Sequence, residues 1–509
     1  MGGQGGVGGS AGGGGMACLP GEEMACYSGP PGTAGMGACK EGVQTCNAQG
    51  SGYGLCFGET IPSPESCATL ADEDCDGNGG ISCPGGVWGR VFGDAGAQAG
   101  FSVTSTPAGE VLLAGRFGGS VNFGGGALQS AGELDVFVAK LDASSGHLWS
   151  RQLFGDEPNE DRTPSIAADA AGGVVLTSGF TTSVDMGAGV VKSAGDSDIL
   201  LAKYDAAGNH VWSKHFGDAS SQIPRGIAVD PAGHTIVAGS FEGTVDFGGG
   251  PLTALGIDVF VAKFDAAGGH VFSKRLGGAL VDDASAVAVD ASGNILLAGH
   301  FEGNVDFGGG PLTSAGGADI FVLKLNPSGA HVWSKAGGGD VTSFVDLAAG
   351  PSGEVIAGGY SQAAVDFGGG PLVSAGSLDI FIAKLDANGG HAWSYRFGDA
   401  AAQLGLGVAV DAGGNAAITG RFKGAADFGL GPLVSAGGDD VFVAKLAPSG
   451  SPLWSQRYGE MLGQNGRDVA FDAAGYVLIT GWMSGTADFG SGPLLGAGGT
   501  DVLLARLAP

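Results

Sequence analysis

The sequence predicts an all-β fold: a seven-bladed β-propeller of four-stranded antiparallel blades, preceded by a small disulfide-rich segment. Two observations predict the propeller. A "VWS" phrase with an aromatic centre recurs every 60–63 residues between residues 87 and 509, and a fixed period of this size is typical of solenoids and propellers. Each copy also contains four short apolar runs, which predicts four strands per blade. The seven aromatic positions are Trp88, Trp149, Trp212, Phe272, Trp333, Trp393 and Trp454.

The copy at residues 285–335 shows how each predicted strand is recognised. SAVAVD (285–290), NILLAGHF (294–301), DIFVLKL (319–325) and HVWSK (331–335) are short and rich in Val, Ile and Phe, as strands are. ASG connects the first run to the second, and NPSGA connects the third to the fourth. In both, Gly supplies the left-handed position that a tight turn needs. The third run is apolar on both faces, which predicts a sheet that lies between two other sheets.

The repeat is divided between the two ends of residues 87–509. The first copy, VWGRVFGD at Val87, lacks a preceding DVFVAK, and the last copy, DVLLARLAP at Asp501, lacks the Trp half. We therefore expect Val87–Asp94 to pair with residues 501–507 as the outermost strand of the last blade, which closes the ring with N- and C-terminal strands. Without this pairing the last blade would expose an unpaired apolar edge.

These phrases resemble a known family. The pattern D-x-F-V-A-K-L-D-x-x-G-x-x-x-W-S-x-x-x-G, followed by I-A-V-D-x-x-G-N and A-G-x-F, is similar to the bacterial seven-bladed β-propeller repeat (SBBP) family over residues 87–509. The departures are local: Phe272 replaces Trp, Gly350 replaces the turn Asp, and Arg506 replaces Lys. The resemblance implies a surface or secreted propeller without a defined activity.

Composition excludes several classes of partner. The formal net charge of −28 repels the phosphate backbone of nucleic acids and anionic lipid surfaces. No apolar run is long enough to span a membrane. We expect no nucleic acid partner and no membrane span.

All cysteines lie in a Gly- and Pro-rich segment, residues 16–86. An even number of cysteines in a short segment predicts a disulfide framework and an oxidising compartment. The alternative is a zinc site, which the absence of any C-x-x-C spacing disfavours. Eight cysteines allow 105 pairings, and the sequence does not choose among them. They are Cys18, Cys26, Cys39, Cys46, Cys56, Cys67, Cys75 and Cys83.

The Gly-rich low-complexity stretch at residues 1–15 predicts a flexible tether, such as one that follows a lipid anchor. It lacks the basic start and apolar core of a signal peptide. We nevertheless expect an extracytoplasmic protein, secreted or anchored at the surface as a lipoprotein, whose export signal is not visible in this chain.

One acidic run has the pattern of half a calcium loop. Asp72, Asp74 and Asp76 alternate before Gly77 and Asn78, and alternating carboxylates can converge on Ca²⁺. Cys83 stands where the bidentate Glu of a complete loop belongs. We expect Ca²⁺, the only cofactor predicted, at Asp72, Asp74, Asp76 and Asn78; the alternative is a solvated acidic turn.

The surrounding segment adds a second resemblance. Residues 39–79 contain the elements Pro-Ser-Pro-Glu-Ser-Cys and Asp-Glu-Asp-Cys-Asp-Gly. They are similar to Cys-rich metal-binding repeats of bacterial surface proteins, and this resemblance implies a metal.

Three sets of polar residues repeat from copy to copy, and we expect structural roles for all three. The cation of DVFVAK predicts an ion pair or hydrogen-bonded clasp within each blade, the Asp of V-D-F-G predicts a loop-starting cap, and the His before the aromatic predicts an exposed turn residue. The cations are Lys140, Lys203, Lys263, Lys324, Lys384, Lys445 and Arg506; the caps are Asp185, Asp246, Asp306, Asp366, Asp427 and Asp488, with Asn122 in the first copy; the histidines are His147, His210, His270, His331 and His391.

The copies differ in two places, which an up-and-down blade brings to the same rim. One is the connection from the fourth strand to the next first strand. The other is the residue after A-G or T-G at the end of the second strand: Arg116, Ser240, His300, Gly359, Arg421 and Trp482. Ligands usually meet a propeller at its loop-rich end; the alternative is drift on an exposed surface. The candidate ligand-binding residues are Arg116, Asp161, Arg162, Arg225, His300, Arg421, Arg467 and Trp482.

No catalytic motif is present: the sequence contains no H-E-x-x-H, G-x-S-x-G or G-x-x-x-x-G-K-[ST]. We therefore name no catalytic residue. We expect a monomeric, rigid binding or structural module whose partner is a protein or carbohydrate at the cell surface. The alternative is a propeller enzyme, a hydrolase or lyase acting on a carbohydrate or a secreted metabolite.

Overall fold

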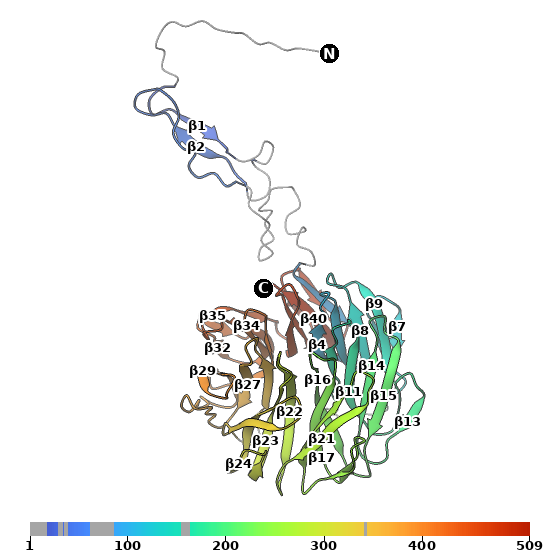
Figure 1. Ribbon diagram of the computed structural model, residues 1–509. Coiled ribbons are helices and arrows are strands. Elements are labelled where there is room, and N and C mark those ends of the chain that lie inside the picture. Colours follow the sequence, from blue (N-terminus) through green and yellow to red (C-terminus); the bar gives the residue numbers. More distant parts are fainter. Residues whose placement is uncertain (1–17, 29–33, 35–38, 62–85, 154–162, 340–343) are drawn as a thin grey trace. The chain divides into compact units, whose positions relative to one another are not determined.

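The computed structural model describes residues 18–28, 34, 39–61, 86–153, 163–339 and 344–509 (Figure 1). It contains two compact units, Met1–Gly86 and Val87–Pro509, which are described separately. The described residues form strands, turns and loops without any helix. Accordingly, no described segment forms a helix that could cross a bilayer.

In the first unit, β1 (Glu23–Cys26) pairs antiparallel with β2 (Gly42–Thr45). Disulfides join Cys18 to Cys46 and Cys26 to Cys56, and Cys39 is disulfide-bonded as well. The predicted disulfide-rich character of this unit is therefore confirmed for its described part. The remaining cysteines, Cys67, Cys75 and Cys83, and the predicted calcium ligands Asp72, Asp74, Asp76 and Asn78 lie outside the described residues.

The second unit is the predicted seven-bladed propeller. Each blade is one four-stranded antiparallel sheet, and its first strand lines a central channel. The first strands are β4 (Gln98–Ser105), β10 (Ser165–Ala168), β16 (Gln222–Val229), β22 (Asp282–Val289), β26 (Phe344–Ala349), β30 (Gln403–Val410) and β36 (Gln464–Phe471). The second strands are β5 (Val111–Phe117), β11 (Val174–Phe180), β17 (Thr235–Phe241), β23 (Ile295–Asp306), β27 (Val355–Ser361), β31 (Ala416–Phe422) and β37 (Val477–Met483).

The outer half of each blade is built in the same way. The third strands are β8 (Asp135–Leu141), β14 (Asp198–Tyr204), β20 (Asp258–Phe264), β24 (Pro311–Leu325), β28 (Asp379–Leu385), β34 (Asp440–Leu446) and β40 (Asp501–Leu507). The fourth strands are β9 (His147–Leu153), β15 (His210–Phe216), β21 (His270–Leu276), β25 (His331–Ala336), β29 (His391–Phe397), β35 (Pro452–Tyr458) and β3 (Trp88–Phe92). We number the blades one to seven from β4, so blade seven consists of β36, β37, β40 and β3.

Small hairpins between second and third strands complete the blades. They are β6 (Ser120–Asn122) with β7 (Ala127–Gln129), β12 (Ser183–Asp185) with β13 (Val190–Lys192), β18 (Thr244–Val245) with β19 (Leu252–Thr253), β32 (Ala425–Asp427) with β33 (Pro432–Val434), and β38 (Thr486–Asp488) with β39 (Pro493–Leu495). In blade four the long strands β23 and β24 include this hairpin.

The hydrophobic core lies between and within the blades, around the third strands. All seven residues of β20, β34 and β40 are buried, as the two-sided apolar pattern predicts. The Phe of V-D-F-G packs onto the Phe of the third strand: the ring centroids of Phe307 and Phe321 are 4.7 Å apart. The turns also agree with the prediction, since Gly233 and Gly268 have φ values of +83° and +84°.

The predicted strand closure is confirmed. Antiparallel pairing runs from Trp88 opposite Arg506 to Phe92 opposite Val502, so the two ends of the propeller share blade seven (Figure 1). The Trp88 side chain is 5% exposed, and its Nε1–H donates to the Ala143 carbonyl of blade one at 2.9 Å. The fourth strand of blade seven therefore also fastens that blade to its neighbour.

Deleting residues 87–92 is expected to lower the melting temperature sharply. The deletion removes the β3–β40 hydrogen bonds, at about 1 kcal/mol each, and the burial of Trp88, worth roughly 2–3 kcal/mol, and it opens the edge of β40. Thermal unfolding by circular dichroism measures the loss. Deleting residues 2–7, a Gly-rich stretch of equal length, is the control and leaves the transition unchanged; similar melting of both variants would refute the closure argument.

Candidate functional site: the variable mouth of the central channel

The central channel is a concavity between the blades. Its volume is about 1200 Å³, and the first strands of all seven blades line it. Each first strand pairs with only one strand of its own blade, so its other edge faces the channel. The two ends of the channel differ in character, and the difference indicates which end carries function.

At one end, which we call the clasp end, the repeated cations form ion pairs. Each cation of a third strand reaches a carboxylate in the turn between the first two strands of its own blade, as predicted. The pairs are Lys140–Glu110 at 2.6 Å, Lys203–Asp169 at 2.9 Å, Lys263–Asp230 at 2.8 Å, Lys324–Asp290 at 2.9 Å, Lys384–Glu354 at 3.3 Å, Lys445–Asp411 at 3.3 Å and Arg506–Asp472 at 2.7 Å.

Two blades keep the clasp although they lack the turn Asp. Thr106 in blade one and Gly350 in blade five occupy its place, and Glu110 and Glu354, four residues later, provide the carboxylate instead. The longer side chain reaches the same lysine from the other end of the turn. The ion pair is therefore maintained where the sequence motif is lost, which supports a structural role.

The clasps also connect neighbouring blades, which the sequence did not reveal. Lys140 of blade one donates to the carbonyls of Gly172 and Ala206 in blade two, at 3.0 and 3.1 Å. Lys324 of blade four donates to the Gly353 carbonyl in blade five at 2.9 Å. One cation thus satisfies a carboxylate in its own blade and carbonyl groups in the next.

The electrostatics of Asp230 show that the clasp holds its carboxylate ionised. Burial alone raises the pKa of Asp230, but hydrogen bonds from Lys263 and from the His234 backbone N–H outweigh that effect and lower it. The side chains of Lys263 and Asp230 are 3% and 4% exposed. Removing either charge alone would leave the other one buried without its partner.

Replacing Lys263 with Met is expected to destabilise the propeller by about 3–5 kcal/mol, because the substitution strands the buried charge of Asp230. Urea unfolding measures this loss. Adding Asp230→Asn removes the stranded charge and retains an oxygen for the turn N–H groups, so the double variant recovers part of the stability. Lys192→Met, on exposed β13, is the control; equal losses for Lys192→Met and Lys263→Met would contradict the clasp.

The Asp of V-D-F-G has the predicted role, whereas the expectation of exposed turn histidines was wrong, because the five histidines begin the fourth strands and are half-buried. Asp246 Oδ1 accepts hydrogen bonds from the N–H groups of Gly248 and Gly250, at 2.7 and 3.0 Å, so it caps its loop. His270 Nε2 lies 3.1 Å from Ser273 Oγ of the same strand. Within the described ranges, no group of three or more His, Cys, Asp or Glu side chains could hold a metal ion.

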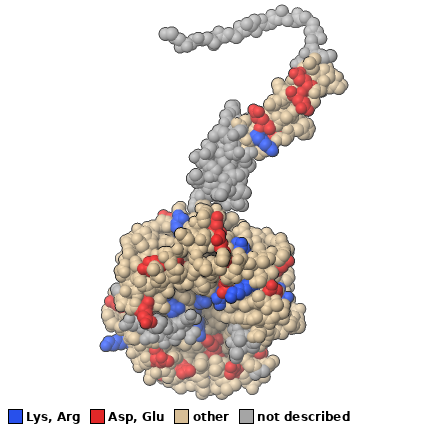
Figure 2. Space-filling model, turned by 180° about the vertical axis from the view of Figure 1, so that it is seen from behind, with Lys and Arg blue, Asp and Glu red and all other residues tan. Residues whose placement is uncertain are grey.

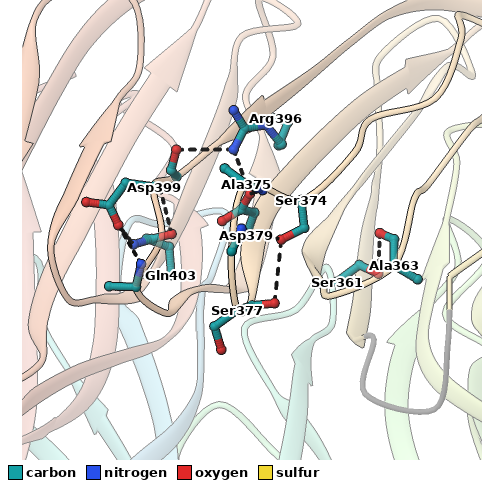
Figure 3. A network of polar contacts seen from close by, with 12 residues as sticks. Ser361, Ala363, Ser374, Ala375, Ser377, Asp379, Arg396, Asp399 and Gln403 are labelled. Atoms are coloured by element: carbon teal, nitrogen blue, oxygen red, sulfur yellow. Dashed lines mark hydrogen bonds and ion pairs between the residues drawn. The ribbon is translucent and has the colours of Figure 1, made fainter.

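At the other end, the connections between blades are ordered by side chains. Asp399 Oδ1 accepts from the Ala401 N–H at 2.8 Å and from Gln403 Nε2 at 2.7 Å, and Asp379 accepts from Arg396 at 2.6 Å (Figure 3). The Ala401 N–H in particular lowers the pKa of Asp399. Hydrogen bonds from side chains therefore fix the connection between blades five and six.

The first strands carry β-bulges at this end. In five blades one residue has no partner in the ladder, and a bulge re-aims the side chain of its unpaired residue. All five of these residues line the channel. They are Phe101, Arg225, Ser285, Leu406 and Arg467.

The variable residues of the second strands, which are last but one in every second strand except the longer β23, lie at the same end, as predicted. In blade four, His300 pairs with Asp283 and therefore lies beside the start of the first strand. One expectation was wrong: in blade five the position belongs to Tyr360, opposite Phe344, and not to Gly359. The A-G dipeptide of that blade lies one residue earlier than in other copies, and the pattern therefore misplaced it.

We call this end the variable mouth and define it by the bulge residues and the residues at that second-strand position. The second-strand residues differ in nearly every blade, whereas the clasp end is nearly uniform. They are Arg116, Gly179, Ser240, His300, Tyr360, Arg421 and Trp482.

The Phe101 ring at the mouth makes cation–π contacts with two guanidinium groups. The Arg116 guanidinium lies 4.7 Å from the centroid of Phe101, and the Arg467 guanidinium lies 5.0 Å from it. Phe101 and Arg116 belong to blade one and Arg467 to blade seven, so this contact crosses the blade boundary. Cation–π contacts of this kind restrict where the two cations can lie.

Three further pairs of side chains lie at the mouth. Phe344 and Tyr360 stack with centroids 5.8 Å apart and an interplanar angle of 14°. Arg225 of blade three pairs with Asp283 of blade four at 3.1 Å. Arg421 pairs with Asp439 at 3.2 Å. The mouth therefore combines held arginines with aromatic faces.

The eight sequence-predicted candidates are placed differently. Arg225, His300 and Arg467 line the channel. Arg116 packs on the channel-lining Phe101, and the charge of Arg421 acts on the channel-lining Tyr360. Trp482 pairs with Asn465 in the ladder and is not among the lining residues. The other two candidates, Asp161 and Arg162, lie outside the described residues.

Sequence reasoning missed several residues of the site: Phe101, Asp283, Phe344, Asp346, Tyr360 and Asp468. The signal for Asp346 and Asp468 was present. At this position of the first strand the other copies have Ser, Gly or Ala, as at Ser102, Gly226 and Ala286. A charged residue at a first-strand position where the other copies have small residues would have indicated these two channel residues.

Asp346 and Asp468 lie in the channel beneath the mouth and link blades. Asp346 accepts from the Val408 N–H of blade six at 2.9 Å, and Asp468 accepts from the Val103 N–H of blade one at 2.8 Å. Burial raises the pKa of Asp346 to about 7, with a contribution from the charge of Asp468. Burial likewise raises the pKa of Asp468 to about 6.

These pKa values predict that stability falls with rising pH. A carboxyl whose pKa is higher in the folded state contributes most stability below its unfolded value near 4, and this contribution is lost as pH rises through 6 to 7. Asp346→Asn removes the charge and keeps an acceptor for Val408. The variant is expected to be more stable than the parent by about 1–3 kcal/mol at pH 8, with a smaller difference at pH 5.

Thermal melts from pH 5 to pH 8 check this expectation. Asp246→Asn is the matched control, because Asn122 occupies the equivalent loop position in blade one and makes the same contacts with Gly124 and Gly126. Parallel pH profiles for the parent and Asp346→Asn would show that Asp346 does not titrate in this range.

Comparisons with known proteins find distant relatives only. No family model matches the chain. The uncharacterized WD repeat-containing protein L264 of Acanthamoeba polyphaga mimivirus is 22% identical over 440 residues, which cover 67% of this chain and 32% of that protein. The regulatory protein FlaEY of Caulobacter vibrioides is 25% identical over 194 residues, which cover 37% of this chain and 20% of that protein. The chain thus spans about a third and a fifth of the length of these relatives.

The solved structure of YCF48 bound to a D1 peptide is similar with a TM-score of 0.39 and 9% identity, over 83% of this chain and 95% of that chain. At this similarity the comparisons do not identify a function for the chain.

Proposed function

We propose that the protein is an exported binding module, a rigid propeller that holds its ligand at the variable mouth of the channel. The observation that carries the proposal is the contrast between the two ends. Residues at the clasp end repeat from blade to blade, whereas those at the mouth differ and face a channel of about 1200 Å³. An asymmetric ligand needs an asymmetric site, and in this ring only the varied positions can provide one.

Export to the cell surface is part of the proposal. The two disulfides Cys18–Cys46 and Cys26–Cys56 support an oxidising compartment. The resemblance of the repeat phrase to SBBP propellers agrees with a surface or secreted location. The proposed partner is accordingly a carbohydrate or a protein of the cell surface.

The alternative, a hydrolase or lyase, would need titratable groups that converge on a substrate. Asp346 and Asp468 are the obvious pair, but each accepts a backbone N–H from the neighbouring blade. At the equivalent position, Ser102 accepts the Ile166 N–H in the same way. A neutral hydroxyl can therefore make the same link, so blade attachment accounts for these residues without catalysis.

Binding tests the proposal directly. The protein of residues 1–509, screened against a glycan array and a surface-protein extract, is expected to retain a ligand. The double variant Phe101→Ala/Arg467→Ala is expected to lose it, because the substitutions remove the ring and one of the arginines that form the mouth. Lys192→Ala, on β13 away from the channel lining, retains binding. Circular dichroism confirms that the variants are folded. A ligand that binds the double variant as tightly as the parent would contradict the proposal.

A further inference from the structure

We propose that the ligand of the variable mouth is a carboxylate-bearing oligosaccharide whose acidic groups contact the arginines of the mouth. This inference rests on the proposed function and adds the chemical class of the ligand. Three features carry it: the arrangement of the arginines, the surfaces around them and the carboxylates below them.

Four arginines lie at this end of an acidic protein. The formal net charge of the protein is −28, and it has only 23 basic residues, yet Arg116, Arg225, Arg421 and Arg467 all belong to the mouth. Arg225 and Arg421 pair with Asp283 and Asp439, whereas Arg116 and Arg467 stack on Phe101. Figure 2 shows Lys and Arg side chains near the middle of the face in view, with acidic side chains among and around them. The guanidinium groups are the donors that an anionic ligand would contact here.

The arginines are held in place before any ligand arrives. Phe101 supports Arg116 and Arg467 together, and Asp283 supports Arg225. A guanidinium group presents paired N–H donors that match a carboxylate in a bidentate geometry. Because the side chains are already positioned by their neighbours, less conformational entropy is lost on binding.

The surfaces beside the arginines fit a sugar better than an acidic peptide. The stacked pair Phe344 and Tyr360 presents an aromatic face at the mouth, and the channel beyond is lined by hydroxyls such as Thr104, Ser105 and Ser165. The channel volume of about 1200 Å³ exceeds the roughly 300–1,000 Å³ typical of small-ligand pockets. This volume accommodates the end of an oligomer with many hydroxyl groups.

The carboxylates below the mouth limit how far an anion can enter. Asp468 follows the bulge residue Arg467, and Asp346 occupies the equivalent ladder position in blade five, so a ligand carboxylate that moves past Arg467 meets negative charge. Sugar hydroxyls can donate to these carboxylates instead. The acidic groups of the ligand are therefore expected at the mouth, with neutral parts of the sugar facing inward.

Calorimetry with the protein of residues 1–509 and a hexamer of galacturonic acid tests this inference. We expect binding that weakens as salt rises, because exposed charges are screened. Arg467→Ala is expected to lose about ten- to a hundredfold in affinity, and Arg467→Lys less, since the charge remains but the paired donors do not. Asp346→Asn binds more tightly than the parent. Lys192→Ala, with the same charge change outside the channel lining, stays within about twofold.

The methyl-esterified hexamer and oligoglutamate separate the alternatives. Loss of binding on esterification supports the proposal, and equal affinity for the esterified hexamer overturns the acidic class while leaving the proposed function intact. Oligoglutamate that binds as tightly as the hexamer, with the same dependence on Arg467, overturns the assignment to sugars. If no acidic hexamer binds but the screened ligand still requires Phe101 and Arg467, only this inference fails; a ligand indifferent to both residues defeats the proposed function as well.

Discussion

The pairing of β3 with β40 is the contact on which every other feature of the propeller depends. A ring of blades has one seam where the first and last blades meet, and here main-chain hydrogen bonds cross it between residues 88–92 and 502–506. Trp88 adds a bond from blade seven to the Ala143 carbonyl of blade one. Because the ring is closed in this way, the seven first strands surround one channel, and side chains from blades one, three, five, six and seven can meet at one mouth.

The contacts that stabilise the fold repeat at the clasp end of the channel, whereas the residues proposed for recognition lie at the mouth. The clasp end repeats an ion pair in all seven blades, even where Glu110 or Glu354 replaces the turn Asp. The mouth repeats almost nothing, although its residues occupy equivalent positions in the ladder. A fold that is stabilised at one end by uniform contacts leaves the other end free to vary, and this freedom is what permits a site without sevenfold symmetry.

The sequence predicted the blades, the closure and the clasp because their residues recur in successive copies. A strand or turn pattern that is weak in one copy becomes reliable when it recurs at the same position in the others. The sequence also placed Arg225, His300 and Arg467 at the correct rim. It missed Phe101 because a pattern of apolar runs does not show where a bulge lies. In blade five it named Gly359 in place of Tyr360, because the A-G dipeptide used to align the copies lies one residue earlier there. The inter-blade bonds of Lys140 and Lys324 needed coordinates, since they join residues 29 to 66 positions apart.

The sharing of one cation between two blades has a mechanical consequence. In an open repeat array each unit contacts only its neighbours, and the terminal units can fray independently. Here the ring has no terminal unit. Opening blade two or blade five would break the clasp of that blade and would also remove the carbonyl groups that Lys140 or Lys324 of the preceding blade contacts. Opening one blade therefore breaks contacts within that blade and contacts with the preceding blade at the same time. The propeller is expected to unfold cooperatively, with protection from hydrogen exchange nearly even around the ring.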